Sequence, residues 1–332
     1  MTLDQKTLNL PIRLRRNRRS PAIRNMICET HLTPHDLVAP LFVIDGEKTK
    51  VPILSMPGVE RLSIDLLIKE VKELSKMGVQ SIALFPVIDP SLKTVDGKEA
   101  WNIDGLMGRA IREIKFAVPE ICIIADVALD PFTTHGHDGL VNEKGEIAND
   151  ETVECLIQMA LMQARAGADF VAPSDMMDGR VGAIRDALDE EGFENTGILA
   201  YSAKYASALY NPFRDALKVK LEFGDKKTYQ MDPANREEAI RETMMDIDEG
   251  ADIVMIKPGL CYLDIVREIK NAVTVPVAVY QVSGEYAMIK AASEKGWLNH
   301  DAVMMEQLTA IKRAGANMIA SYFAKDAVKL IS

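Results

Sequence analysis

Two lysines each follow a buried-looking apolar run, an arrangement that suits covalent chemistry on a carbonyl. Lys204 ends the run in YSAKYAS, and Lys257 ends the run in MIKPG. A lysine with its ordinary pKa of about 10.4 is protonated at pH 7 and cannot attack a carbonyl. Burial and a second ammonium nearby both disfavour the charged form, and the neutral amine can form a Schiff base. The alternative is that each lysine extends from its strand into solvent, which is harder to maintain for two lysines on neighbouring strands.

Basic and hydroxyl side chains elsewhere suit the binding of an anionic substrate. Arg214 in NPFRDA and Lys226 in GDKKTYQ lie on a connection of about fifty residues, and connections that long are often lids. As isolated charges they would instead be solvated surface residues. Ser283 in YQVSGEY and Tyr322 in SYF come at two further strand ends, where their hydroxyls could hold a carboxylate or an enol.

A polar loop, DVALDPFTTHGHDG, follows another apolar run and indicates either a metal site or a lid. Its polar side chains are Asp126, Asp130, His135, His137 and Asp138. The His-x-His pair is also found in metal-dependent amidohydrolases. That interpretation is weak, because the other three histidines lie away from the strand ends and a metallohydrolase needs more ligands there.

Two more acids occur in APSDMMDGRVGAIR. Asp175 and Asp178 precede a predicted helix and could cap its N-terminus. An acid on the catalytic rim is equally consistent with their position after a strand.

The elements that would position these residues alternate short apolar runs with longer amphipathic stretches. Continuous apolar strands indicate burial on both faces, as in a parallel sheet. No G-x-G-x-x-G follows any of the runs, which disfavours an open dinucleotide-binding sheet. Eight strands suggest a closed (β/α)8 barrel, in which chemistry lies at the C-terminal strand ends. The predicted strands span 38–44, 81–86, 122–129, 169–173, 197–203, 253–258, 277–282 and 318–323.

Six stretches between these runs have apolar residues at spacings of three and four, which predicts helices with one buried face. They cover 64–77, 104–117, 151–166, 236–249, 262–272 and 301–314. A helix end, a glycine and a strand recur at Gly78, Gly167, Gly250 and Gly315, where a helix C-terminus favours a left-handed residue.

Composition excludes several classes of protein. The 332 residues carry a net charge of −10, which disfavours general nucleic-acid binding, and no apolar run is long enough to span a membrane. The start MTLDQKTLNL is unlike a secretory signal. Four cysteines without paired spacing fit a reducing cytoplasm.

One basic segment departs from the acidic average of the chain. We interpret it as a solvated or partner-docking arm rather than a nucleic-acid arm. Its arginines are Arg13, Arg15, Arg16, Arg18, Arg19 and Arg24.

Several of these motifs together resemble the porphobilinogen synthase family, also called 5-aminolevulinate dehydratase. They are YSAKYAS, MIKPG, NPFRDA, APSDMMDGRVGAIR, VYQVSGEYAM and the HGHDG loop, and the resemblance runs from about residue 11 to the C-terminus. It implies an enzyme that joins two molecules of 5-aminolevulinate into porphobilinogen with loss of two waters, in tetrapyrrole synthesis. A class I aldolase-like Schiff-base lyase remains the alternative, and an assembly protein without activity would not need the two lysines.

Position by position, the resemblance assigns roles to several of these residues. Lys257 matches the Schiff-base lysine of the first-bound substrate, and Ser283 and Tyr322 match the groups that bind its carboxylate. Lys204 matches the lysine of the second substrate, and Arg214 matches the lid arginine for the second carboxylate. Where many members have a second arginine, this chain has Lys226, which keeps the charge but lacks the planar fork.

The polar loop departs from the zinc-dependent members, which carry three cysteines there. Ala128, Asp130 and Asp138 stand at those positions, so the loop resembles the cysteine-free class. We therefore expect no zinc requirement, and a monovalent or magnesium ion at Asp130 and Asp138 is one expectation. Glu242 falls at the family's allosteric magnesium position, although the sequence alone is equally consistent with an ordinary exposed helix residue.

The resemblance also implies a homo-octamer in which N-terminal arms wrap neighbouring barrels. We accordingly expect residues 1–35 to form an assembly arm and residues 36–332 to form the catalytic barrel.

Overall fold

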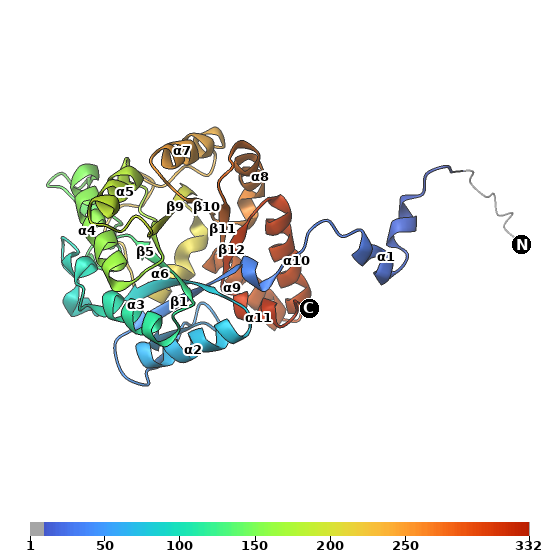
Figure 1. Cartoon of the computed structure of the whole chain (residues 1–332), viewed down its shortest axis with the longest axis horizontal. Helices are drawn as coiled ribbons and strands as arrows, with labels where there is room; N and C mark the ends of the chain where they lie inside the picture. The colour runs from blue at the N-terminus through green and yellow to red at the C-terminus, as the bar shows by residue number, and fades with distance from the viewer. Residues whose placement is uncertain (1–9, 332) are drawn as a thin grey trace, which may run out of the picture. The chain divides into compact units, whose positions relative to one another are not determined.

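A computed structural model describes residues 10–331 of the chain. Eight parallel strands form a closed barrel, and helices surround it on the outside (Figure 1). The strands are β1 (Leu37–Ile44), β4 (Ser81–Val87), β5 (Cys122–Val127), β8 (Phe170–Pro173), β9 (Gly197–Lys204), β10 (Ile253–Lys257), β11 (Val277–Gln281) and β12 (Met318–Ser321).

Pairing of the last strand with the first closes the barrel. β12 pairs in parallel with β1, with Leu37 opposite Ile319, and each other strand pairs with its neighbours in chain order. All eight predicted strands are confirmed, with ends that differ by a few residues. The continuous apolar runs gave the correct strands because barrel strands are covered on both faces.

The six predicted helices are confirmed, and the structure adds α5, α6, α9 and α11. The helices of the barrel unit are α2 (Ile64–Lys76), α3 (Leu106–Ala117), α4 (Asn149–Ala166), α5 (Arg180–Glu190), α6 (Asn211–Leu217), α7 (Glu237–Asp248), α8 (Leu263–Ala272), α9 (Ser283–Glu294), α10 (His300–Ala314) and α11 (Ala324–Val328). Single 3-10 turns are η2 (Pro34–Asp36), η3 (Pro90–Leu92), η4 (Lys98–Trp101), η5 (Ala208–Tyr210) and η6 (Leu260–Tyr262). Gly167 and the other three predicted helix-ending glycines have positive φ, as expected for left-handed caps.

Two small hairpins accompany the eight barrel strands. β2 (Lys50–Pro52) pairs antiparallel with β3 (Glu60–Ser63), which lies parallel to the end of β1. β6 (Leu140–Val141) and β7 (Ile147–Ala148) form a separate pair before α4. Neither hairpin has a strong apolar pattern, and the sequence analysis did not predict them.

The described part of the N-terminal segment is a unit of its own. Contacts divide the chain between His31 and Leu32. The segment contains the 3-10 helix η1 (Leu14–Arg18) and the helix α1 (Pro21–Met26), whose N-terminus is capped by the Ser20 hydroxyl. None of its described residues is buried. Across residues 10–331, no helix combines the length and the hydropathy needed to cross a membrane.

Candidate active site

Lys204 and Lys257 lie side by side at the C-terminal mouth of the barrel. Each is the last residue of its strand, and the two are register partners between β9 and β10. Both side chains are buried, with 6% and 5% of the residue exposed. The structure therefore brings together the two lysines that the sequence placed on neighbouring strand ends, and it removes both from bulk water.

Aromatic rings surround the amine of Lys257. Its Nζ lies 4.6 Å from the ring centre of Tyr280, 4.9 Å from that of Phe213, 5.0 Å from that of Tyr201 and 5.3 Å from that of Tyr210. Burial lowers the pKa of Lys257 to about 7, and the charge on Lys204 acts in the same direction. A large fraction of this amine is consequently neutral near pH 7 and able to attack a carbonyl.

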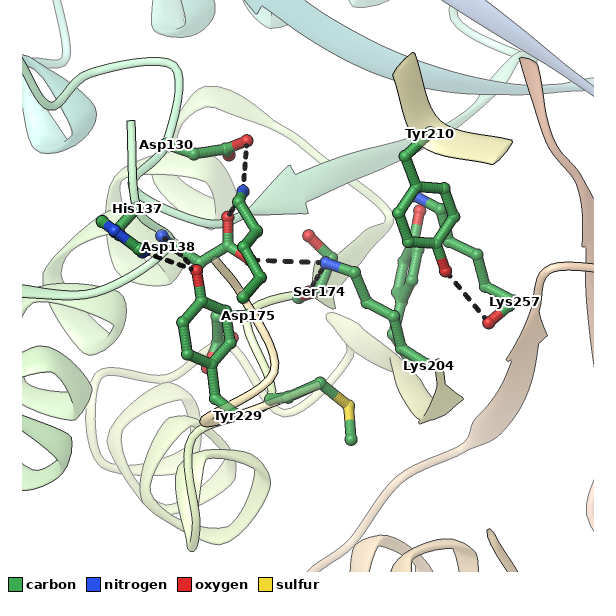
Figure 2. Close-up of polar contacts among 12 residues, drawn as sticks. Asp130, His137, Asp138, Ser174, Asp175, Lys204, Tyr210, Tyr229 and Lys257 are labelled. Carbon is green, nitrogen blue, oxygen red and sulfur yellow. Dashed lines mark hydrogen bonds and ion pairs between the residues drawn. The ribbon is translucent and has the colours of Figure 1, made fainter. Parts of the chain in front are cut away.

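The amine of Lys204 has polar partners instead. Its Nζ donates a short hydrogen bond to the backbone carbonyl of Ser174, after β8, and lies 3.6 Å from Oδ2 of Asp138. Figure 2 shows the Lys204 side chain between Asp138 on one side and the Tyr210 and Lys257 pair on the other. The two lysines therefore occupy different surroundings in one site: Lys257 among rings, Lys204 between oxygen atoms.

Asp126, next to the last residue of β5, is a third buried group of the site, and it is near enough to both lysines to interact with their charges. Burial raises the pKa of Asp126 to about 7, while the charges of Lys257 and Lys204 oppose that rise. The hydroxyl of Ser174 also bonds this carboxyl. A carboxyl with a pKa near 7 can take and return a proton during catalysis, as general acid–base chemistry requires.

The predicted polar loop brings Asp130 and Asp138 to the same site, and both are bonded to Lys226. The ammonium of Lys226 lies 2.5 Å from Oδ1 of Asp138 and 3.2 Å from Oδ2 of Asp130. Although burial opposes ionisation of a lysine, the two carboxylates raise the pKa of Lys226 above its usual value. Lys226 is thus a buried cation within the site and not a solvated lid charge.

The two histidines of the loop hold the loop in place. His137 uses both ring nitrogens, one toward the hydroxyl of Tyr229 and one toward the carbonyl of Phe223. Nε2 of His135 faces the carbonyl of Val95, and its Nδ1 accepts from the backbone N–H of His137. Because these ring nitrogens have protein partners, the amidohydrolase interpretation of the His-x-His pair has no geometric support.

Ser283 and Tyr322 each form a hydrogen bond with a residue whose ring faces the amine of Lys257. The hydroxyl of Ser283, the first residue of α9, accepts from the backbone N–H of Phe213 at 3.0 Å. The hydroxyl of Tyr322 lies 2.9 Å from that of Tyr280. Since Phe213 and Tyr280 both face the amine of Lys257, the two predicted hydroxyls lie around that lysine.

Arg214 lies on α6, the helix that also brings Phe213 to Lys257. Arg61 holds the C-terminal end of this helix through hydrogen bonds. Arg214 is partly exposed and lies near the Oδ1 of Asn211, at 3.4 Å. The buried guanidinium of Arg61, on β3, donates to the carbonyls of Asp215 and Ala216, both at 2.6 Å. The last carbonyls of a helix lack partners within its regular ladder. That of Asp215 also accepts from the backbone N–H of Lys218, and Arg61 adds a charged donor to both carbonyls and thereby anchors α6.

Asp175 and Asp178 lie in the loop before α5 and hold it by hydrogen bonds. Oδ1 of Asp175 accepts from the backbone N–H of Met177 at 2.7 Å, and burial raises the pKa of Asp175 to about 6. Asp178 is exposed and its backbone exchanges hydrogen bonds with the side chain of Asn149. The N-cap of α5 is Gly179 and no side chain caps this helix, so the capping interpretation was wrong for both residues. Asp175 instead fixes the turn one residue after the carbonyl that bonds Lys204.

Glu242 lies on the outer helix α7, apart from the strand ends. Its side chain is half-buried and lines a cavity of about 780 Å³ that also contains Asp178, Asp232 and Glu238. Burial raises the pKa of Glu242, and the nearby charge of Arg180 opposes that rise. No cluster of three or more His, Cys, Asp or Glu side chains suited to a metal occurs among residues 10–331.

Sequence reasoning missed the rings around Lys257, the role of Ser174 and the anchor Arg61. One signal was available: Tyr280 follows Val279, which pairs with Ile256, so Tyr280 belongs at the level of Lys257. Arg61 gave no such signal, because its partners lie more than 150 residues further along the chain.

Known proteins share this fold and sequence. The sequence profile of the delta-aminolevulinic acid dehydratase family matches residues 11–330. A delta-aminolevulinic acid dehydratase of Bradyrhizobium diazoefficiens is 55% identical over 323 residues, covering 97% of this chain and 91% of that protein. One from Bacillus subtilis is 50% identical, with 96% and 98% covered. The crystal structure of delta-aminolevulinic acid dehydratase (porphobilinogen synthase) from Toxoplasma gondii, in complex with the product porphobilinogen, is 52% identical. It superposes with a TM-score of 0.96, covering 98% of this chain and 92% of that one.

Proposed function

The chain belongs to the delta-aminolevulinic acid dehydratase family, and we propose that Lys257 and Lys204 are the lysines through which it condenses two molecules of 5-aminolevulinate into porphobilinogen. The observation that carries this proposal is the pairing of the two buried lysines in the register of β9 and β10. An aldolase-like lyase, the alternative considered from the sequence, is set aside by the family match. The reaction belongs to tetrapyrrole synthesis.

Each lysine first forms a Schiff base. The neutral amine of Lys257 adds to the ketone of one substrate, and the carbinolamine loses one water to give an iminium ion. Lys204 forms the second iminium in the same way, which releases the second water. A carbon–carbon bond and a carbon–nitrogen bond then join the substrates, and each lysine leaves as a free amine. The net loss is two waters, and Asp126 is placed to accept and return protons.

The substrate carboxylates would be held on the two sides of the lysines. We assign Ser283 and Tyr322 to the substrate on Lys257, because both hydroxyls contact residues that face that amine. We assign Arg214 and Lys226 to the substrate on Lys204. Two of the three N–H groups of Lys226 point to Asp138 and Asp130, and the third can bond a carboxylate.

Pyrrole formation tests the function directly. Incubation with 5-aminolevulinate should give a product that colours with Ehrlich's reagent. Borohydride added during turnover should fix the mass of one substrate on the peptide containing Lys257. Absence of pyrrole from a folded protein would reject the function, and trapping elsewhere would reject the assignment of Lys257.

We further propose that Mg²⁺ activates the enzyme through Glu242 and that zinc is not needed. Mg²⁺ is commonly bound by one or two carboxylates while it keeps several waters, and the cavity beside Glu242 offers carboxylates and room for such an ion. Zinc prefers thiolate and imidazole ligands. Ala128, Asp130 and Asp138 supply neither, and Cys122 begins β5 at the opposite end from the loop.

A homo-octameric assembly through the N-terminal arm is also proposed. The described arm is about twenty residues long, and a segment of that size cannot bury a core alone. It nevertheless exposes apolar side chains, such as Ile12 at 74% and Met26 at 77%. Burial against a second copy of the chain would account for both features. Analytical ultracentrifugation of the full chain against a variant lacking residues 1–31 would test this.

The proposed location is the cytoplasm. Support comes from Cys28, Cys122, Cys155 and Cys261, all of which are free thiols in the structure, as expected in a reducing compartment.

A further inference from the structure

Asp130 and Asp138 form a buried acid pair that already has a cation between them. The two residues are 7% and 1% exposed, and the ammonium of Lys226 bonds an oxygen of each, at 3.2 and 2.5 Å. Lys226 itself is only 6% exposed. The second oxygen of Asp138 faces Lys204 at 3.6 Å, as Figure 2 shows. Three of the four carboxylate oxygens of the pair therefore face ammonium groups.

A metal ion at this pair would need the oxygens that Lys226 holds. Mg²⁺ requires oxygens at about 2.0–2.1 Å in an octahedral arrangement, and monovalent ions likewise bind through oxygen atoms. The neighbouring imidazoles cannot complete a site, because His137 is bonded through both ring nitrogens and His135 through the loop backbone. The residues present therefore do not fit a metal ion while Lys226 stays in place.

The charges in the site balance without an ion. The carboxylates of Asp130 and Asp138 lie against the ammonium groups of Lys226 and Lys204. The remaining pair, Asp126 and Lys257, has no net charge whether their shared proton lies on the carboxyl or on the amine. The half-buried Lys93 adds a positive charge near Asp130. An added divalent ion would leave an uncompensated positive charge in a buried site, which is strongly unfavourable.

We propose that the ammonium of Lys226 is the built-in cation of this acid pair and takes the place that a metal ion would otherwise occupy. The expectation of an ion at Asp130 and Asp138 is thereby replaced by a covalently attached charge that cannot dissociate. This inference goes beyond the synthase function, because it concerns what occupies the acid pair and not which reaction takes place.

Mn²⁺ binding, measured by electron paramagnetic resonance on the full-length protein, tests the inference. All variants carry Glu242→Ala, so that the proposed regulatory site does not contribute. With Lys226 intact, we expect no bound Mn²⁺ that depends on Asp138. Lys226→Met, which removes the charge but keeps a side chain of similar length, should gain one Mn²⁺ per chain. Adding Asp138→Asn should remove that ion again.

The matched control is Lys227→Met, because Lys227 is the adjacent lysine and its side chain is 75% exposed. This variant should behave as its parent does. Circular dichroism would check that each variant is folded.

Two results would overturn the inference. The first is an Mn²⁺ ion bound with Lys226 intact and lost with Asp138→Asn, a measurement that does not depend on the folding of any Lys226 variant. The second is a folded Lys226→Met that gains no ion. Neither readout involves pyrrole formation, so failure of this inference and failure of the proposed function can be told apart.

Discussion

Lys204 and Lys257 are opposite each other in the register of β9 and β10, yet their amines have unlike surroundings. The amine of Lys257 faces the rings of Tyr280, Phe213, Tyr201 and Tyr210, whereas that of Lys204 faces the Ser174 carbonyl and a carboxylate. Two lysines at matching positions thus differ in the environment of their amines, and we expect them to differ in reactivity.

Trapping of substrate at Lys257 should depend on pH around 7. The pKa of Lys257 is lowered to about 7, and only the neutral amine attacks, so borohydride trapping should rise as pH increases through 7 and level off above it. Lys204→Met removes a positive charge that lowers this pKa, and the midpoint should move upward by about one pH unit. A midpoint unchanged by Lys204→Met would mean that the two amines do not interact. Lys257→Ala should abolish pyrrole formation.

Lys204→Ala should separate the two substrate sites. The variant should lose pyrrole formation but still permit trapping of one substrate at Lys257, because that amine keeps its ring surroundings. Mass spectrometry of the reduced protein would count the attached substrates. Loss of all trapping in a folded variant would show that the sites are too tightly coupled to be assigned separately.

Neutralising Arg214 or Lys226 should mainly raise the KM for 5-aminolevulinate. A hydrogen bond to a charged partner is worth about 1.5–3 kcal/mol, so Arg214→Gln and Lys226→Gln should each raise KM about tenfold or more. Lys220→Gln is the matched control, since Lys220 is an exposed lysine on the same connection. An unchanged KM in both test variants would indicate that these charges do not bind substrate.

Arg61→Met should loosen α6 without touching any residue that contacts substrate. The carbonyls of Asp215 and Ala216 would lose their charged donor, at a cost of about 2–3 kcal/mol in the free energy of unfolding. Limited proteolysis within residues 205–235 should become faster, and KM should rise because Phe213 and Arg214 lie on this helix. Arg61→Lys should rescue little, since one ammonium cannot reproduce the fork. Proteolysis at the wild-type rate would argue against the anchor.

Zinc removal should leave activity intact, and Mg²⁺ should stimulate it through Glu242. In Glu242→Ala the stimulation should disappear while basal turnover remains, because α7 lies away from the strand ends. Pyrrole formation in metal-stripped buffer, with and without Mg²⁺, measures both. Inactivation that only zinc reverses would contradict this reading of the loop, and loss of all turnover in Glu242→Ala would move that residue's role to structure or catalysis.

The sequence predicted the barrel well because its strands and helices have strong local patterns. The helix α7, the glycine Gly250 that follows it and the strand β10 each follow from a local sequence pattern. Lys204 and Lys257 could be paired because neighbouring barrel strands end at the same rim.

The remaining site depends on contacts between distant segments, which periodicity does not encode. Arg61 meets α6 across more than 150 residues, and the ring of Phe213 comes from a helix too short to show a period. Lys226 was placed on a lid facing a substrate carboxylate. The Lys226 side chain points inward because it is attracted by the carboxylates of Asp130 and Asp138, which lie 96 and 88 residues away in the chain.

The lysine bridge between Asp130 and Asp138 also bears on how the protein withstands chemical stress. Soft heavy metals such as lead and cadmium inhibit by binding thiolates, and oxidants inactivate thiolates by converting them to sulfenic and higher acids. An ammonium held by two carboxylates offers neither reaction, since it has no sulfur to oxidise and no ion to displace. The acid pair should therefore survive peroxide and soft metals that would disable a thiolate-bound metal at the same place.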